Sequence, residues 1–455
     1  MKKYIISILT LLTLFSSTVS AQATAAVAPT VDSGDTAWMI VAIALVLLMT
    51  MPGLALFYGG LVRRKNVLNV FMQCFMIVAV ISIEWVICGY SLSFGSSKGF
   101  LAPFIGGFDW AFLQNINLGD LSPYFISHSQ TALDGSTVGT IPHIVFIMFQ
   151  CMFAVITPAL IIGAFAERIK FKGFLIFTIL WSLLVYNPVA HWVWSADGWL
   201  FKLGALDFAG GTVVHINAGI AAIVTAVMLG KRRDYKGHAI PAHNITYVVM
   251  GAGLLWFGWF GFNAGSGLAA DGLAGNAFMV THIAAATAAL TWALIDWFVD
   301  KRPTIVGIST GAVAGLVAIT PAAGFVGVTG ALIIGVVVSL ICYGMVAFIK
   351  PKLGYDDSLD AFGVHGIGGI IGAILTGVLA TPAIQSAYSG AAYGNWHQLL
   401  VQLIAVGATI LYSGIGTIIL FKVTDKIFGL RASDKQEAIG LDETQHGETA
   451  YTKFD

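Results

Sequence analysis

DFAGGTVVHINAGIAAIVTAVMLG (207–230) and DAFGVHGIGGIIGAILTGVLA (360–380) are two apolar stretches of membrane-spanning length, and each contains one histidine. An ionisable side chain in hydrocarbon is costly, so it usually faces a pore, a cavity or a protein partner. His215 and His365 each follow an aspartate by a few residues, Asp207 and Asp360. One chain therefore offers the same unusual feature twice, which indicates a single site built from two related halves.

The composition indicates an integral membrane protein. The 455 residues are 57% hydrophobic and only 10% charged, whereas a soluble domain carries roughly 25% charged residues. The length allows about a dozen helices of ~20 residues with their loops. The formal net charge is zero, and we expect a lipid bilayer rather than a nucleic acid as the surroundings of this chain.

Eleven apolar segments follow the first 21 residues, and each is long enough to be a spanning helix. They cover residues 36–58, 69–94, 142–165, 173–193, 209–229, 244–264, 276–298, 304–320, 329–349, 361–380 and 397–421. The strands of a membrane barrel would instead alternate apolar and polar side chains. We therefore predict an all-α integral membrane protein with 11 transmembrane helices in a domain over residues 22–421, followed by a cytoplasmic tail over 422–455.

The first residues have the pattern of a secretory signal. Lysines at positions 2 and 3 precede an apolar stretch over 5–15, and VSA (19–21) resembles a cleavage site. We predict a cleaved signal peptide over 1–21, with an uncleaved anchor as the alternative. Cleavage would leave the mature N-terminus outside.

The basic residues predict the orientation. With the N-terminus outside and eleven spans, the cytoplasmic side would hold the basic residues at 63–65, 168–172, 231–236, 301–302, 350–352 and from 422 onward. Among the mature basic residues, Lys98 and Lys202 alone would fall outside. Cytoplasmic loops carry an excess of Lys and Arg, so the pattern favours a multi-pass protein of the cytoplasmic (inner) membrane with a cytoplasmic C-terminus.

Spans one to five and six to ten divide into two halves. Because five is an odd number, the second half must be inverted relative to the first, and a final helix completes the eleven. His215 and His365 then occupy equivalent positions in the fifth and tenth spans. Inverted repeats that share a site near the bilayer midplane are a common transporter design. We predict such a repeat here.

The two histidines have several chemical interpretations. A neutral imidazole both donates and accepts hydrogen bonds and titrates near neutrality, so a facing pair could relay a proton or bind a small polar solute. A packing role and ligation of metal or haem are the alternatives. No set of carboxylates or further histidines accompanies the pair, so we expect no metal and no cofactor. The four cysteines form no CxxC pair and are expected to be buried small hydrophobes.

Aspartates and aromatic residues complete the candidate set. Asp207 and Asp360 precede Gly-containing helix starts, where a carboxylate can cap backbone N–H groups or attract a cation. Aromatic residues gather on the predicted outer side at Phe149, Phe153, Trp194 and WFGWFGFNAGSG (256–267), which contains Phe262 and Ser266. They are either an interfacial belt or the aromatic faces of a cation site. Glu84 in span two and the loop over 95–141 receive no role.

Several long motifs resemble those of the ammonium transporter (Amt/Mep/Rh) family, in its bacterial Amt branch. They are MPGLALFYGGLVRRKNVLN (51–69), GAFAERIKF (163–171), DFAGGTVVHINAGIAA (207–222), GWFGFNAGS (258–266), TPAAGFVG (320–327), DAFGVHGIGG (360–369) and the tail elements GLR, GLD and HGE-x-AY. The match runs from about residue 35 to residue 451. Glu84 stands where an apolar residue is more usual in the family.

The resemblance implies a function and a set of roles. It implies a homotrimer that conducts ammonium or ammonia, and also methylammonium, through one path in each subunit. Trp194, Phe149, Phe153 and Ser266 would recruit the ion, Phe153 and Phe262 would form the gate, and His215 and His365 would line the pore. Asp207 matches a buried acidic residue with a structural or electrostatic part. The tail resembles the segment that couples to a PII-type regulatory protein of nitrogen metabolism.

Physical chemistry fits this function. An intact ammonium ion is expensive to move into hydrocarbon, and K⁺ would need dense oxygen coordination. Ammonium can instead lose a proton and cross as neutral ammonia, guided by the histidines. Two other classes stay open: an ammonium sensor that signals through a partner protein, and an intramembrane enzyme. The spans offer no convincing nucleophile, metal cluster or acid pair, so we expect no enzymatic activity.

Overall fold

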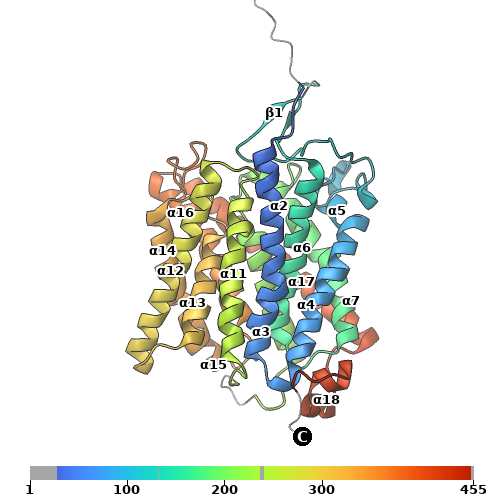
Figure 1. Cartoon of the computed structure of the whole chain (residues 1–455), viewed down its shortest axis with the longest axis vertical. Helices are drawn as coiled ribbons and strands as arrows, with labels where there is room; N and C mark the ends of the chain where they lie inside the picture. Colours follow the sequence, from blue (N-terminus) through green and yellow to red (C-terminus); the bar gives the residue numbers. More distant parts are fainter. Residues whose placement is uncertain (1–27, 133, 236–239, 452–455) are drawn as a thin grey trace, which may run out of the picture.

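Eleven apolar helical segments run along one axis of the molecule in the computed structural model, which describes residues 28–132, 134–235 and 240–451 (Figure 1). Ten of the segments in this part of the chain are long and apolar enough to cross a membrane, and the shorter one is α13. This confirms the all-α membrane fold and the number of segments. The signal peptide expected over 1–21 lies outside the described residues.

The segments of the first half are partly interrupted by π-helical turns. In chain order they are α2 (Ser33–Leu48), η1 (Met49–Leu54) and α3 (Ala55–Leu61); η2 (Arg64–Asn66), α4 (Val67–Glu84), η3 (Trp85–Gly89) and α5 (Tyr90–Phe94); α6 (His143–Phe165); α7 (Phe171–Trp181), η6 (Ser182–Tyr186), α8 (Asn187–Trp194) and α9 (Trp199–Leu203); and η7 (Gly211–Ile216) with α10 (Asn217–Leu229).

The second half and the tail follow in the same way. They are α11 (Ile245–Gly265), α12 (Gly272–Asp300), α13 (Ile305–Ile319), α14 (Val328–Gly344) with η8 (Met345–Ile349) and α15 (Lys350–Leu353), η9 (Phe362–Gly366) with α16 (Ile367–Leu379), α17 (Trp396–Phe428), α18 (Asp434–Ile439) and η11 (Asp442–His446). The last spanning helix therefore continues past residue 421, where we expected the tail to begin. Short 3-10 turns η4 (Gly99–Leu101), η5 (Ala111–Leu113) and η10 (Ala391–Tyr393) lie in the loops.

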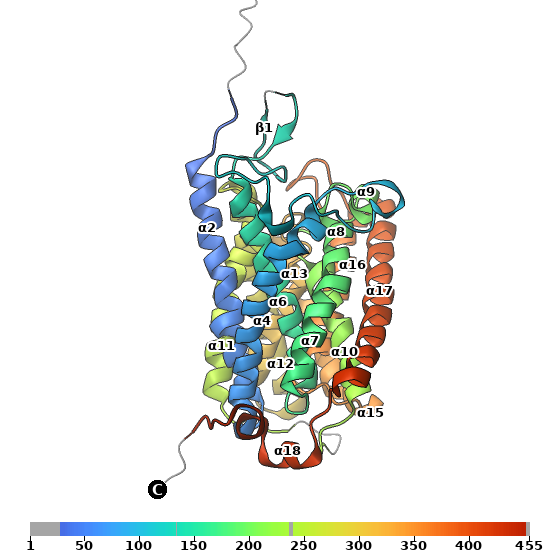
Figure 2. The same cartoon turned by 90° about the vertical axis from the view of Figure 1, so that its right-hand side faces the viewer.

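The two histidine-bearing segments are arranged as an inverted repeat requires. Successive segments cross the bundle in alternating directions (Figures 1 and 2), so η7–α10 and η9–α16 begin at opposite ends. Each begins with a π-helical turn that contains the histidine and continues as an α-helix of 13 residues. Entering from opposite ends, both turns reach the middle of the molecule.

The loop over 95–141 folds over one end of the bundle. It contains the hairpin of β1 (Gln130–Thr131) and β2 (Thr137–Val138), which pair antiparallel with Gln130 opposite Val138. Its base packs by aromatic contacts, since the Tyr124 ring stacks on Phe146 of α6 at 4.9 Å between centroids. This loop therefore has a fixed place above the upper ends of the helices in the view of Figure 1.

The tail docks at the opposite end of the bundle, where α18 lies below the helices (Figure 2). Asp442 accepts hydrogen bonds from the backbone N–H groups of Leu68 and Asn69 at 3.1 and 2.8 Å, at the start of α4. Lys65 donates to the carbonyl oxygens of Glu437 and Ala438. The tail is thus hydrogen-bonded to the loops between spans rather than projecting into solvent.

Candidate functional site

His215 and His365 meet in the middle of the bundle. Their Nδ1 atoms are 3.3 Å apart, and their rings stack with centroids 5.3 Å apart at an interplanar angle of 18°. Both side chains are buried, and the Nε2 of His215 has no hydrogen-bond partner among the described residues. A free ring nitrogen in an apolar cavity is available to a small polar molecule.

Glycines allow the two turns to approach so closely. A Cβ added at Gly219, four residues after His215, would overlap the backbone of Gly366, the residue after His365. A Cβ added at Gly369 would lie 3.0 Å from the Cβ of His215. Small residues at helix crossings let backbones come together in membranes, and here they bring the imidazoles into contact.

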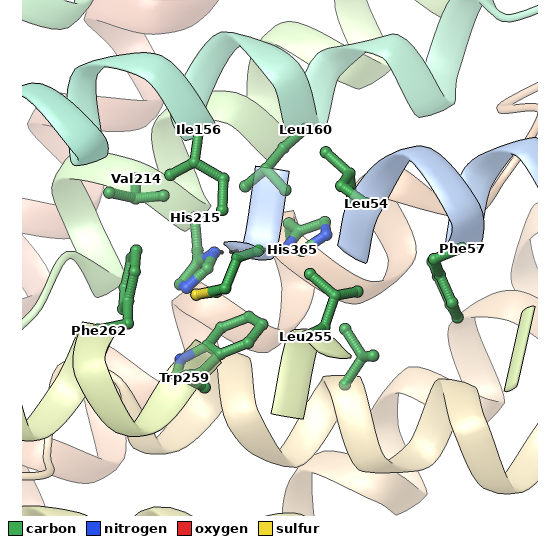
Figure 3. Close-up of a pocket in the computed structure, with 12 residues that line it drawn as sticks. Leu54, Phe57, Ile156, Leu160, Val214, His215, Leu255, Trp259, Phe262 and His365 are labelled. Carbon is green, nitrogen blue, oxygen red and sulfur yellow. Dashed lines mark hydrogen bonds between the residues drawn. The ribbon is translucent and has the colours of Figure 1, made fainter. Parts of the chain in front are cut away.

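The cavity around the histidines is narrow and apolar. Figure 3 shows the imidazoles side by side, with Phe262 at one end and Phe57 at the other. The other lining residues are Met49, Leu54, Ile156, Leu160, Val214, Leu255, Trp259 and Val313. About 10 Å³ is open to the centre of a water-sized molecule, close to the minimum that one water needs. The cavity therefore has room for about one molecule of the size of water or ammonia.

Two phenylalanines close one end of this cavity. The rings of Phe153 and Phe262 have centroids 4.3 Å apart, and Phe262 in turn lies 6.0 Å from the His215 ring. Phe153 is 1% exposed and Phe262 is fully buried, so the rings leave no open passage between the two sides. Trp194 meets Phe153 edge-on at 5.6 Å between centroids.

A wider cavity of about 490 Å³ lies beyond the phenylalanines. Trp194 and Ser266 line it, and the Ser266 hydroxyl donates to the carbonyl oxygen of Phe262 at 2.9 Å. Phe149 does not line it: this ring is fully buried and packs edge-on against Phe153. The structure thus places Trp194 and Ser266 at the cavity wall and Phe149 behind Phe153.

The loop over 95–141, to which we gave no role, contributes to the wall of this outer cavity. Pro123, Tyr124, Phe125 and Ile126 line it, as does Tyr388 from the loop after α16. We missed these residues because they lie in segments without periodicity. The aromatic residues that follow Pro123 in the sequence were the one feature that could have indicated a place at the cavity wall.

Asp207 holds the start of the fifth segment. Its two carboxylate oxygens accept hydrogen bonds of 2.6 to 3.1 Å from the backbone N–H groups of Gly210, Gly211, Thr212 and Val213. The first four N–H groups of a helix have no partner within the helix, and Asp207 supplies it. The Trp194 indole N–H donates to the Asp207 carbonyl oxygen at 3.0 Å, which links this cap to the outer cavity.

The matching cap in the tenth segment is Asp357, so our expectation of a cap at Asp360 is wrong. The Asp357 carboxylate accepts from the N–H groups of Ala361 and Phe362 at 3.1 and 2.8 Å. Asp360 has a left-handed backbone (φ 58°), which turns its carboxylate toward Lys350 at 2.6 Å. The sequence did contain the signal: Asp207 and Asp357 each stand eight residues before their histidine.

Outside the membrane segments, a buried ionic cluster fixes the loop that carries Asp357. Asp356 pairs with Arg232 at 2.8 Å and lies 3.9 Å from the guanidinium of Arg168, and both arginines are buried. Burial alone would raise the pKa of Asp356, but its hydrogen bonds and the two positive charges hold that pKa below its usual range. The four cysteines are free, and the described residues contain no cluster that could hold a metal ion.

Comparisons with known proteins agree with this arrangement. A family model described as "Ammonium Transporter Family" matches residues 37–451. The ammonium transporter of Bacillus subtilis is 48% identical over 92% of this chain and 98% of its own, and Amt1 of Archaeoglobus fulgidus is 44% identical over 92% and 100%. Among solved structures, Candida albicans Mep2 superimposes with a TM-score of 0.80 at 35% identity, covering 90% of this chain and 88% of its own.

A structure described as "Sensor Amt Protein" is also similar, with a TM-score of 0.80 and 30% identity over 90% of this chain and 97% of its own. The family model and the relatives span nearly the whole multi-pass bundle, including both histidine segments. The chain belongs to the ammonium transporter family.

Proposed function

We propose that this protein transports ammonium and ammonia across the cytoplasmic (inner) membrane. The observation that carries the proposal is the pair of stacked imidazoles in a narrow apolar cavity, closed on one side by two phenylalanines. Trp194 and Ser266 recruit ammonium at the outer cavity, with Phe149 supporting Phe153 from behind. The ion loses a proton at the gate of Phe153 and Phe262, and His215 and His365 guide ammonia through the pore.

The dimensions and chemistry of the two cavities support this sequence of steps. The outer cavity offers aromatic faces, which attract a cation by about 0.5–2 kcal/mol each, and the Ser266 oxygen. The inner cavity offers room for about one water-sized molecule and no ring of oxygen ligands. K⁺ and Na⁺ cannot become neutral, and so the inner cavity excludes them. Ammonia forms hydrogen bonds with imidazole nitrogens and carries no charge.

Asp207 and Asp360 do not line the histidine cavity, and we assign them structural and electrostatic roles. Asp207 fixes the start of the His215 segment and places a negative charge at the base of the outer cavity, where it favours a cation. Asp360 pairs with Lys350 at the other end of the molecule and contributes there to the local electrostatics.

Further proposals concern assembly and topology. We propose a homotrimer of one-path subunits, a cleaved signal over 1–21, a transmembrane domain over 22–421 and a cytoplasmic tail over 422–455. The basic loops 63–65, 168–172 and 231–233 support a cytoplasmic location for the end where the tail docks. A tail with this many contacts to the loops supports a regulatory contact with a PII-type protein at that face.

Transport can be tested by measuring charge movement in proteoliposomes after an ammonium pulse, with a K⁺ pulse as control. We expect an ammonium-specific current, or internal alkalinisation without current if ammonia alone crosses, and no response to K⁺. Silence in both assays, with the protein correctly inserted, would contradict transport and favour the sensor function. Two observations favour the sensor function as the second candidate: the similarity to the structure described as "Sensor Amt Protein" and the docking of the tail on the bundle.

The role of the histidines needs a matched variant. His215→Ala should lower the ammonium response or let K⁺ through, because the cavity loses one of its two polar walls. His282→Ala is the control, since His282 lies exposed on α12 away from the cavity. Unchanged rate and selectivity in His215→Ala would contradict the part assigned to the histidines and leave the gate as the source of selectivity.

A further inference from the structure

Asp35, in the first turn of α2, is a buried carboxylate that contacts two other segments of the chain. One of its oxygens accepts a hydrogen bond from the backbone N–H of Ala270 at 2.8 Å. The other oxygen lies 2.9 Å from Nδ1 of His128 and accepts from the Thr140 hydroxyl. Asp35 therefore joins the loop over 95–141 to the connection between α11 and α12.

His128 faces a second carboxylate with its other ring nitrogen. Its Nε2 lies 3.7 Å from a carboxylate oxygen of Asp271, which is the N-cap residue of α12 and accepts from the backbone N–H of Ala274. The His128 side chain is 42% exposed, so its ring exchanges protons with the solution. We call Asp35, His128 and Asp271 the loop cluster.

The two segments that the loop cluster joins also form two parts of the wall of the outer cavity. Residues 123–126 of the loop line this cavity, and His128 follows them in the chain. Ser266 and Leu268 line it from the connection between α11 and α12, and Asp271 follows them. The contact between His128 and Asp271 therefore sets how one part of the wall is placed against the other.

The charge of His128 decides how strongly the ring holds Asp271. In an imidazolium both ring nitrogens carry protons, so the ring is a cation between two carboxylates. A neutral ring can keep its hydrogen bond to Asp35 with the remaining proton on Nδ1, but it then directs the lone pair of Nε2 toward Asp271. Loss of the proton therefore replaces an attraction at Asp271 by a repulsion.

The groups around His128 keep it protonated to a higher pH than usual. The hydrogen bond to Asp35 raises the pKa of His128 above its usual value of about 6.5, although burial acts against it. The negative charges of Asp35, Asp271 and Asp32, the N-cap residue of α2, raise this pKa further. The ion pair is thus complete below about pH 6.5 and is lost as the pH rises through the higher pKa of the folded protein.

We propose that His128 is a pH-dependent positioning residue of the outer cavity: protonated, it holds the loop over 95–141 against the start of α12, and deprotonated, it releases this contact. Asp35 and Thr140 keep the loop attached to α2 in both states. Ammonium binds more weakly after the release, because the two parts of the wall lose their mutual placement. This effect on ammonium rests on the proposed transport function, whereas the protonation of the loop cluster does not.

Solid-state NMR of ¹⁵N-histidine-labelled protein in bilayers tests the loop cluster without any transport. The signals of His128 and His397 are assigned by their absence in His128→Gln and His397→Gln. We expect His128 to lose its proton at a higher pH than His397, which lies exposed at the start of α17. A wild-type His128 that titrates no higher than His397 would overturn the proposal.

Asp271→Asn tests the partner of His128 while keeping the cap of α12, because Asn is among the preferred N-cap residues. The His128 titration should move to lower pH in this variant, since one negative charge beside the ring is gone. Asp109→Asn, at an exposed position of the same loop, is the control and should leave the titration unchanged. Equal His128 titrations in Asp271→Asn and wild type would remove Asp271 from the cluster and overturn the proposal.

Uptake of methylammonium tests the effect on the outer cavity. This probe stays protonated well above neutrality, as the primary amine of lysine does with a pKa of about 10.4. The wild-type KM should rise about fivefold as the pH rises through the His128 titration, a coupling at the lower end of the usual range between two sites, with a smaller change in kcat. His128→Gln should show the high KM at every pH, and His128→Arg, which stays charged, the low KM. His397→Gln should keep the wild-type profile.

Three kinetic results would contradict the positioning role. The first is a wild-type KM that stays constant across the His128 titration. The second is a KM that falls there, because the charge of His128 would then act on the cation directly by repulsion. The third is a His128→Arg profile equal to that of the wild type. The expected NMR titration without any uptake of ammonium or methylammonium would leave the loop cluster intact and contradict the proposed function alone.

Discussion

At the scale of single residues, Asp207 and Asp357 both cap a histidine-bearing turn, but they accept different numbers of hydrogen bonds. Asp207 accepts from four backbone N–H groups and Asp357 from two. Each stands eight residues before a histidine of the cavity, so each fixes the turn on which one imidazole is carried. The stability of the two turns should therefore depend on these carboxylates to different degrees.

Asp207→Asn should destabilise the protein by about 1–3 kcal/mol, because the amide nitrogen of Asn would face N–H donors that need an acceptor. Asp357→Asn should cost less, since fewer donors lose their partner. The thermal unfolding midpoint of the purified protein in detergent measures both effects. Asp109→Asn, at an exposed position of the loop over 95–141, is the control, and an equal loss in all three variants would contradict the capping role.

At the scale of elements, the crossing of η7–α10 with η9–α16 is limited by glycine. Gly219→Ala forces a methyl group against the backbone of Gly366, and overpacking of this kind costs about 1–3 kcal/mol. Gly253→Ala on α11 is the matched control, because a Cβ there meets open space, and Ala in a helix is favoured over Gly by roughly 0.5–1 kcal/mol.

The two glycine variants should thus shift the unfolding midpoint in opposite directions. We also expect Gly219→Ala to reduce ammonium transport, since the imidazoles can no longer approach to 3.3 Å between their Nδ1 atoms. A Gly219→Ala protein as stable and active as the wild type would show that the crossing can relax without moving the histidines.

The ionic cluster of the loop before the tenth segment predicts a dependence on pH. The pKa of Asp356 is held below its usual range in the folded protein. Its stabilising contribution is therefore complete above the unfolded pKa of about 3.9 and is lost as the pH falls through the lower folded pKa. Asp356→Asn removes the carboxylate that Arg168 and Arg232 share and leaves Arg232 only its pair with Glu167 at 3.3 Å; it should cost about 3–5 kcal/mol near neutrality.

The difference between wild type and Asp356→Asn should shrink as the pH falls through the acid range, as measured by unfolding midpoints at several pH values. Asp234→Asn is the control, because Asp234 is 61% exposed where it pairs with Arg63, and an exposed pair contributes at most about 1 kcal/mol. A difference that stays constant down to strongly acidic pH would contradict this assignment.

At the scale of the whole molecule, the docked tail connects the loops of one end of the bundle. Asp442→Asn should loosen the tail, because Asp442 accepts from the start of α4 with two hydrogen bonds. Limited proteolysis should then cut the tail faster than in the wild type, while the spans stay protected. Glu443→Gln, exposed and adjacent, is the control. Equal cleavage rates in both variants would show that other contacts hold the tail.

The spans could be predicted from the sequence because lipid imposes a simple rule on them. A spanning helix needs about 20 apolar residues whatever its neighbours are, and most predicted ends agree with the structure within a few residues. The end of α17 at Phe428 was missed because the last turns contain Lys422, Asp425 and Lys426, which hydropathy assigns to solvent. The helix continues there beyond its apolar part.

The candidate site was predictable where an unusual residue interrupted an apolar pattern, as at His215 and His365. It was not predictable where the function of a residue depends on a distant partner. Asp357 and Asp360 are near neighbours in sequence, and the left-handed backbone at Asp360 decides which of them caps the helix. Likewise, Glu84 was conspicuous in the sequence, but its partner Asn187 lies 103 residues away.

The antiparallel approach of the two histidine turns has a consequence for the direction of flux. In the proposed transport, a molecule that reaches the two imidazoles from either end meets one ring and then its counterpart from the other half of the chain. The histidine pair would then give no preferred direction to this transport, and the gradient alone would decide the net flow past it. A preference for one direction of transport would have to originate in the parts that the repeat does not duplicate. These are the wide aromatic cavity at one end and the docked tail at the other.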